Sequence, residues 1–418
     1  MHQDTHTRLS GRLGLAIVAG LMIAAYGEAQ AASLNYLGQQ TLATGTQFAG
    51  TQVGGLSGID YNARTGGYFA ISDDRSQFNP ARFYGLNLDL AQFQRSNTPG
   101  SAGVAFNQVT TLLTAGGSAF GALTVDPESI RLLPGASGPT LLWTNEGQRS
   151  AGGFQSPTLR QAALDGGHLR DFSVPAAYMP TGSSSGAAAG DSGIRNNLAF
   201  ESLTVSKDGK TAWIATENAL AQDGPAAAFG VASPSRVAQF NVASGLRERE
   251  YVYLTDAVTD APNPAGSFAT NGLVELLAID DSHFLAVERS FSTGVGNNIR
   301  IYLSSTAGAS DVSGLASLAG QSYQAMSKSL LLDLGTVKND DGSALLLDNV
   351  EGITFGPVVN GKQTLVLVAD NNFASSQQTQ FIAFSVDGAL APVPEPTSWA
   401  LMLSGLLALG AAARKQRK

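Results

Sequence analysis

Residues 199–218 read AFESLTVSKDGKTAWIATEN, and this stretch predicts a β-hairpin. Polar and apolar residues alternate on both sides of a Lys-Asp-Gly-Lys turn at 207–210, which is the period-2 pattern of paired antiparallel strands. The first strand opens on Glu201 and the second closes on Glu217. Because the start of one antiparallel strand lies beside the end of its partner, we expect these two carboxylates to sit together at one end of the hairpin.

The same arrangement recurs four more times along the chain. In three of these repeats an acid opens the first run and another closes the second, as in Glu128 with Glu146, Glu275 with Glu288, and Glu351 with Asp370. The remaining repeat opens on Ser57, where the others carry Glu, and closes on Asp73 and Asp74. The five openings are 71, 73, 74 and 76 residues apart, so one structural unit is repeated five times.

Each repeat has room for four strands, because further apolar runs follow each hairpin. The fifth hairpin is followed by a single such run at 380–387, and the run at 33–42 is expected to supply its fourth strand. A ring closed by both ends of the chain removes open sheet edges. We therefore predict an all-β fold, a β-propeller of five four-stranded blades, or six if a loop hides another. Two β-sandwiches or a solenoid fit less well, since the period is too regular for the former and too long for the latter.

Residues 1–32 have the organisation of a secretory signal peptide. Arg8 and Arg12 precede an apolar run over residues 13–26, and residues 29–31 provide small side chains for cleavage. A membrane anchor is the alternative, although the run is short for a span. Export is therefore expected, and since the chain has no cysteine, no disulfide stabilises the exported domain.

A second signal occupies residues 393–418. Pro394-Glu395-Pro396 is followed by an apolar stretch at 399–413 and then by a basic tail. This order resembles the PEP-CTERM sorting signal of Gram-negative bacteria that make exopolysaccharide. The resemblance implies processing by an exosortase and delivery to the cell envelope or the medium, with transient anchoring in the inner membrane; a plain tail anchor is the alternative. Residues 33–392 between the two signals are expected to form the propeller domain.

The charge balance narrows the choice of partners. The whole chain carries 25 Lys and Arg and 33 Asp and Glu residues, for a net charge of −8. The terminal signals hold six of the basic residues and three of the acidic ones, so the domain between them has a net charge of about −11. An acidic domain argues against a nucleic-acid partner and favours cations or neutral surfaces. The sequence contains no P-loop, dinucleotide fingerprint or zinc-ligand spacing.

We expect the acids that open and close the hairpins to form a ring at one mouth of the channel, since the first strand of each propeller blade lines that channel. The predicted ring comprises Asp73, Asp74, Glu128, Glu146, Glu201, Glu217, Glu275, Glu288, Glu351 and Asp370. Crowded carboxylates repel one another, so some must be protonated, paired or neutralised by a cation. Oxygen ligands without Cys or clustered His favour Ca²⁺. Alternatively, each acid accepts backbone N–H groups between neighbouring blades.

Four residues are candidates for catalysis. Glu201 and Glu128 would act as general acid or base if the crowded site raises the pKa of one of them. Arg75 and Arg149 follow the strand ends of the first two repeats and are suited to bind phosphate or carboxylate through paired hydrogen bonds. The alternative partners of these two arginines are the ring acids themselves.

Several motifs together resemble a known family. They are GGLSGIDYNARTGGYFAISDDRS (54–76), ARFYGLNL (81–88), DPESI (126–130), WTNEGQ (143–148), LAFESLTVSKDGKTAWIATENA (198–219) and NVEGITF (349–355). The set is similar to the "esterase-like activity of phytase" (phytase-like) family over about residues 45–387. The resemblance implies phosphomonoester or ester hydrolysis on a propeller. It transfers a functional role to eight positions in the matching motifs: Asp73, Asp74, Arg75, Glu128, Glu146, Glu201, Glu217 and Glu351.

The leading hypothesis is an exported, calcium-dependent hydrolase acting on phosphate esters or related small-molecule esters. Ca²⁺ held by the ring would polarise the phosphoryl oxygen and activate water, and Arg75 or Arg149 would stabilise the developing charge. One alternative is a non-catalytic envelope protein that binds exopolysaccharide. Another is a lactonase-like propeller with a single central metal.

Overall fold

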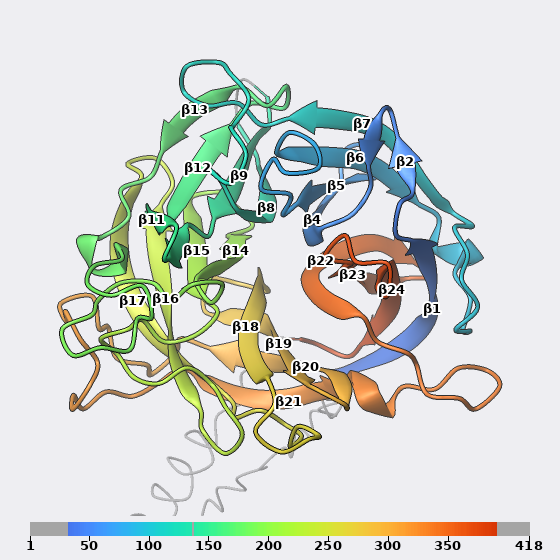
Figure 1. Ribbon diagram of the computed structural model, residues 1–418. Helices are drawn as coiled ribbons and strands as arrows, with labels where there is room; N and C mark the ends of the chain where they lie inside the picture. Colours follow the sequence, from blue (N-terminus) through green and yellow to red (C-terminus); the bar gives the residue numbers. More distant parts are fainter. Residues whose placement is uncertain (1–31, 136–137, 391–418) are drawn as a thin grey trace, which may run out of the picture.

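The computed structural model describes residues 32–135 and 138–390, and they form five four-stranded antiparallel sheets around a central channel (Figure 1). The prediction of a five-bladed β-propeller is therefore confirmed. Residues 1–31 of the expected signal peptide and the whole segment 393–418 lie outside the described residues. Among the described residues, no helix is long and apolar enough to cross a membrane.

Each blade is ordered from the channel outward. Blade 1 contains β4 (Leu56–Asn62), β5 (Gly67–Ser72), β6 (Arg82–Leu88) and β7 (Val104–Thr111). Blade 2 contains β8 (Pro127–Leu133), β9 (Thr140–Asn145), β12 (Thr158–Ala162) and β13 (His168–Asp171). Blade 3 contains β14 (Phe200–Val205), β15 (Thr211–Thr216), β16 (Ser233–Asn241) and β17 (Leu246–Thr255). Figure 1 shows β4, β8 and β14 nearest the centre of the ring.

Blade 4 contains β18 (Ala269–Ala278), β19 (His283–Ser292), β20 (Gly296–Ser305) and β21 (Ser327–Asp333). Blade 5 contains β22 (Asn349–Val359), β23 (Lys362–Asp370) and β24 (Gln378–Asp387), and its outer strand is β1 (Ser33–Ala43) from the start of the domain. The pairing of β1 with β24 runs from Ser33 opposite Asp387 to Ala43 opposite Gln378, so the predicted closure of the ring is confirmed. Two minor hairpins and three 3₁₀ turns complete the fold: β2 (Gln47–Phe48), β3 (Thr51–Gln52), β10 (Gln148–Ser150), β11 (Gly153–Gln155), η1 (Leu90–Gln92), η2 (Ala176–Tyr178) and η3 (Leu334–Thr336).

The hydrophobic core lies between neighbouring blades. In the hairpin of β14 and β15, Leu203 and Ile214 point to the blade 2 side, and Trp213 and Ala215 point to the blade 4 side. Alternation along each strand thus gives every blade two apolar faces, and each face packs on its neighbour. Burying one such Leu or Ile side chain stabilises the fold by about 1.5–3 kcal/mol.

A bulge interrupts the first pairing of every blade near the start of the inner strand. The register shifts around Ser57, Glu128, Glu201 and Glu351 in four blades. An extra residue in one strand changes the direction of its side chain, so Glu128, Glu201 and Glu351 face the channel mouth. Ser57 instead donates to the carbonyl of Glu128 at 2.6 Å. In blade 4 the shift falls on Val274, between Leu273 and Glu275. The predicted position of Glu275 in the repeat is therefore wrong by one residue.

The same strand pairings show which residue ends the second strand of each blade at the channel mouth. Leu56 pairs with Ser72, Phe200 with Thr216, Leu273 with Glu288 and Val350 with Ala369. The residue that follows each of these partners faces the mouth, namely Asp73, Glu217, Arg289 and Asp370. Blade 4 therefore presents Arg289 and not Glu288, and it contributes no acid to the ring.

Candidate functional site

A buried acidic cavity occupies one mouth of the channel, where the inner strands begin and their partners end. Its volume is about 220 Å³. Seven acidic residues line it: Asp74, whose carboxylate is ion-paired with Arg82, and six others, namely Asp73, Asp126, Glu128, Glu201, Glu351 and Asp370. Glu146 and Glu217 adjoin these six acids through Glu201 and complete what we call the acid cluster. The structure therefore brings together eight carboxylates from blades 1, 2, 3 and 5.

Two groups of three carboxylates are close enough to share a cation. In one group the oxygens of Asp126, Glu128 and Glu146 all lie within 4.8 Å of one another. In the other, the oxygens of Glu146, Glu201 and Glu217 do so. Glu146 belongs to both groups and links them across the boundary between blades 2 and 3, where its Oε1 also accepts the backbone N–H of Ala199 at 2.7 Å.

Burial and mutual repulsion make the acid cluster hold protons tightly. The pKa values of Asp73, Glu128, Glu146 and Glu201 lie well above the usual range, first because these groups are buried and then because neighbouring carboxylates repel. Burial also raises the pKa of Asp126 and of Glu351 to about 7. For Asp370, burial and the charge of Glu351 raise the pKa to about 8. In the absence of a cation, part of the cluster is therefore protonated near neutral pH.

Two arginines supply positive charge at the edge of the cluster. Arg289 Nη2 lies 3.2 Å from Glu351 Oε1 and 3.5 Å from Glu217 Oε1. Arg75 Nε lies 3.2 Å from Asp126 Oδ2, and Arg75 Nη2 donates to Gln148 Oε1 at 2.5 Å. Eight carboxylates thus share two nearby guanidinium groups, which leaves an excess of negative charge.

The backbone makes room for these carboxylates. Gly55 has φ +63°, and a Cβ there would overlap Asp73 Oδ1. A Cβ at Gly272 would likewise overlap Glu217 Oε1. Asp73 Oδ1 is buried and has no hydrogen-bond partner among the described residues. Because an unpaired buried carboxylate oxygen is costly, this atom points to a ligand that the protein is built to receive.

Two residues assigned to the site from sequence have structural partners instead. Asp74 accepts the backbone N–H groups of residues 77–79 at 2.7–3.1 Å and forms a buried ion pair with Arg82 at 2.7 Å. Arg149 is buried, donates to four backbone carbonyls of the loop 181–194, and lies 3.4 Å from Asp191. Asp74 therefore shapes the loop beside the cavity, and Arg149 holds down a surface loop and cannot reach a substrate in the cavity.

Glu275 and Glu288 also lie apart from the acid cluster. Glu275 Oε2 is 2.9 Å from Arg131 Nη2, deeper in the channel, and accepts the hydroxyl of Ser129 at 2.7 Å. Glu288 lies between strands of blades 3 and 4, where Tyr253 and Lys328 donate to its Oε1 at 2.7 Å and 2.5 Å. The blade 4 register explains both corrections, because a shift of one residue turns a side chain to the opposite face.

The sequence analysis missed two members of the site. Asp126 precedes the second hairpin by two residues and was not part of the hairpin pattern, although it lies within the DPESI motif. Arg289 directly follows Glu288, and the sequence shows it as a basic neighbour of the expected ring acids, but we did not assign it a role in the site. Its place at the mouth depends on the position of the blade 4 bulge.

A larger cleft adjoins the acidic cavity on the same mouth. It has a volume of about 880 Å³ and shares Asn197, Glu351 and Asn372 with the cavity. The rest of its wall includes four amide and two aromatic side chains, beside small apolar and charged residues: Asn196, Asn297, Asn349, Gln377, Phe268 and Phe291. Beside the cavity, Phe78 stacks on Phe373 with ring centroids 4.5 Å apart. The site therefore combines a small anionic centre with a wide, hydrogen-bonding approach.

The backbone at this approach is strained. Asn372 and Phe373 both have positive φ, at 46° and 52°. A bulky aromatic residue seldom adopts this conformation, and such strain concentrates at functional sites. Here it places Asn372 in both the cavity and the cleft, while Phe373 reaches the ring of Phe78.

Comparison with known proteins gives a family and a sorting motif. The family model described as "Esterase-like activity of phytase" matches residues 51–373. A PEP-CTERM protein-sorting motif matches residues 392–418; it indicates export and envelope-associated sorting and implies recognition by an exosortase. No curated protein matches the chain.

Solved structures match the chain only distantly. The propeller of Dos1 is 8% identical, with a TM-score of 0.32, over 79% of this chain and 68% of that one. The GH32 β-fructofuranosidase BmSUC1 of Bombyx mori is 8% identical (TM-score 0.36; 84% and 61% covered). A protein of unknown function from Dyadobacter fermentans is 8% identical (TM-score 0.35; 85% and 99% covered). At these scores the likenesses carry no argument about function.

Proposed function

The chain belongs to the family of esterase-like activity of phytase, and from this premise we propose that it is an exported hydrolase of phosphate esters or related esters whose acid cluster binds Ca²⁺. The observation that carries the proposal is the eight-carboxylate cluster with two nearby guanidinium groups and an unpaired buried oxygen on Asp73. Such an excess of buried negative charge requires protons or a cation. Hard oxygen ligands alone suit calcium better than a transition metal.

The donor set fits this ion. Asp126, Glu128 and Glu146 would hold one cation, and Glu146, Glu201 and Glu217 would hold the same or a second one. When bound, Ca²⁺ would supply charge that polarises the ester oxygen and lowers the pKa of a water molecule. Asp73 Oδ1 is available as a further ligand.

The remaining chemistry falls to the chain's own groups. Arg75 and Arg289 stand at opposite edges of the acid cluster and would orient an anionic ester by charge-assisted hydrogen bonds. Whichever of Glu201 and Glu128 does not hold the cation keeps a pKa raised by burial and neighbouring carboxylates, and it would pass a proton to the leaving oxygen or take one from water. Arg149 has no part in this proposal, because its donors are committed to the loop 181–194.

A direct assay tests the proposal. Purified protein is incubated with p-nitrophenyl phosphate, phytate, p-nitrophenyl acetate and a simple lactone, with calcium and with chelator. We expect calcium-dependent turnover of at least one phosphate or carboxylic ester that Glu201→Gln abolishes and that Glu248→Gln, at an exposed acid on β17, leaves intact. Turnover that persists in chelator would contradict a calcium-dependent mechanism.

The second candidate is a non-catalytic module that binds exopolysaccharide. The observation that favours it is the amide-rich and aromatic wall of the 880 Å³ cleft, since amides hydrogen-bond hydroxyl groups and aromatic faces pack on sugar rings. Binding of extracellular polysaccharide that Phe268→Ala weakens, without hydrolysis of any ester above, would favour this function. Phe268 is exposed, so the variant should fold normally.

A further inference from the structure

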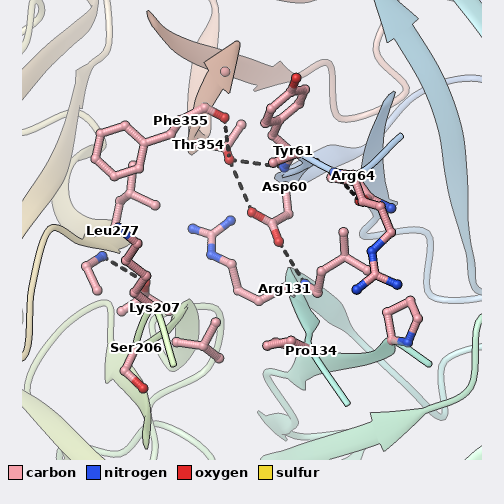
Figure 2. A pocket seen from close by; sticks show the side chains of 18 of the residues that line it. Asp60, Tyr61, Arg64, Arg131, Pro134, Ser206, Lys207, Leu277, Thr354 and Phe355 are labelled. Atoms are coloured by element: carbon pink, nitrogen blue, oxygen red, sulfur yellow. Dashed lines mark hydrogen bonds between the residues drawn. The ribbon is translucent and has the colours of Figure 1, made fainter. Parts of the chain in front are cut away.

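The opposite mouth of the channel contains a second pocket, with a volume of about 870 Å³ (Figure 2). It is built from the same repeat as the acid cluster, because the residue three positions after each bulge faces it. These residues are Asp60, Arg131, Thr204, Leu277 and Thr354. The ring of acids at one mouth is thus replaced at the other by a ring of mixed polarity.

Arg131 provides the buried polar centre of this pocket. Its side chain is about 1% exposed, and its terminal nitrogens donate to backbone carbonyls and to Glu275. Its Nε is buried and has no hydrogen-bond partner within the described part of the chain. Figure 2 shows the guanidinium in the middle of the pocket. Because Nε is also closed off from solvent, Arg131 acts on the pocket through its positive charge and not through a free donor.

An acceptor stands across the pocket floor from Arg131. Asp60 accepts the backbone N–H of Leu132 at 2.7 Å and the hydroxyl of Thr354 at 3.2 Å, and its carboxylate faces the pocket in Figure 2. The floor therefore offers a half-buried carboxylate near a buried positive charge. A hydroxyl group of a ligand can donate to Asp60.

The walls are apolar and the rim is basic. Tyr61, Leu277 and Phe355 flank the pocket, and Val358, which is 64% exposed, presents apolar surface to solvent. At the rim, the exposed side chains of Arg64 and Lys207 bring two positive charges. A pocket of several hundred cubic ångströms with apolar walls and a few convergent polar groups is typical of small-molecule sites.

We infer that this pocket is a second binding site, for a small hydroxylated organic anion with an apolar body. The body lies between Leu277, Phe355 and Tyr61, and the hydroxyl end donates to Asp60. The anionic end lies at the rim, near Arg64 and Lys207. This site is independent of the acid cluster, from which the Arg131–Glu275 ion pair separates it.

A matched pair of fluorescent probes tests the inference. The affinity of the full protein for 6-hydroxy-2-naphthoate is compared with that for 2-naphthoate by fluorescence titration, in calcium and in chelator. We expect the hydroxylated probe to bind about tenfold more tightly, because its hydroxyl group donates to the Asp60 carboxylate and 2-naphthoate cannot. We also expect calcium to leave both affinities unchanged, which distinguishes this pocket from the acidic mouth. Failure of both probes to bind at millimolar concentration would overturn the inference.

Exposed variants locate the bound probe without endangering the fold. Val358→Asp, Arg64→Gln and Lys207→Gln should each weaken binding severalfold, because they place negative charge on the wall or remove positive charge from the rim. The matched controls are Val359→Asp and Lys210→Gln, which alter neighbouring residues outside the pocket. Equal effects in the test and control variants would show adventitious surface binding and would also overturn the inference.

Discussion

Arg131 Nη2 and Glu275 Oε2 lie 2.9 Å apart inside the channel, and together they contact all five blades. Arg131, from blade 2, donates to carbonyls of Ile59, Leu276 and Ile353 in blades 1, 4 and 5. Glu275 in turn accepts the backbone N–H of Leu203 in blade 3 at 2.9 Å. This buried pair therefore ties the inner strands together and closes the channel between its two mouths.

Substitution of Glu275 by Gln should destabilise the protein strongly. The variant leaves the Arg131 charge buried without its partner, which costs about 3–5 kcal/mol of unfolding free energy. Urea denaturation measures the change. Lys210→Gln is the matched control, because its ion pair with Asp208 is exposed and should contribute about 0–1 kcal/mol. Equal stability of the two variants would show that the central pair does not hold the blades together.

The metal-free protein should lose stability as the pH rises. The carboxyl groups of the acid cluster have higher pKa values in the folded protein than in an unfolded chain. At pH values between the unfolded and the folded pKa, the folded state therefore binds more protons, and its stability falls as the pH rises. In chelator we expect a lower urea midpoint at about pH 8 than at about pH 5. Glu201→Gln removes one such acid and should reduce this slope. A midpoint that rises over the same range in chelator would contradict the proposed crowding.

Calcium should reverse that trend. A cation binds the deprotonated carboxylates of the folded state, so its stabilising effect should be larger at about pH 8 than at about pH 5. Thermal unfolding with calcium and with chelator at each pH measures the difference. A calcium effect of the same size at both pH values would show that the ion binds elsewhere than at groups that titrate in this range.

Arg289→Gln should increase the dependence on calcium. Arg289 is the positive partner of Glu217 and Glu351, so its removal leaves both acids with less compensation. The metal-free variant should unfold about 3 kcal/mol more easily, the expected cost of breaking a buried pair, and calcium should restore more stability than in the original protein. For an anionic substrate, KM should rise as well. An unaltered calcium response would place Arg289 outside the site.

Arg149→Met should affect the loop 181–194 and spare the acid cluster. The variant removes the donors that hold four loop carbonyls, so limited proteolysis within the loop should become faster. Calcium affinity should stay unchanged. A large loss of calcium binding with an intact loop would restore the catalytic role first assigned to Arg149.

Sequence alone was sufficient for the fold and for much of the site. The spacing of the hairpins predicted the five blades, and the missing strand after 380–387 predicted the pairing with residues 33–42. Antiparallel geometry also predicted that Glu201 lies beside Glu217 and that both lie close to Glu128, Glu146 and Glu351. These inferences depend on periodicity, which a repeat protein displays many times over.

The errors arose where one residue of register decides the outcome. Val274 occupies the bulge of blade 4, so Glu275 turns inward to Arg131 and Arg289 replaces an acid at the mouth. A bulge depends on the local pairing of two strands, and the alternation of side chains does not locate it. Most partners of Asp74 and Arg149 are loop backbone atoms, which no side-chain pattern reveals.

Calorimetric titration of Ca²⁺ into the purified protein and its Glu146→Gln variant tests the central claim most directly. Glu146 belongs to both carboxylate groups, so its neutralisation should affect every cation held by the cluster. We predict binding at about pH 8 with a dissociation constant below about 1 mM, weakened at least tenfold in Glu146→Gln and unchanged in Glu248→Gln. Absence of binding, or equal affinity in the Glu146 variant, would contradict the assignment of this mouth as a calcium site.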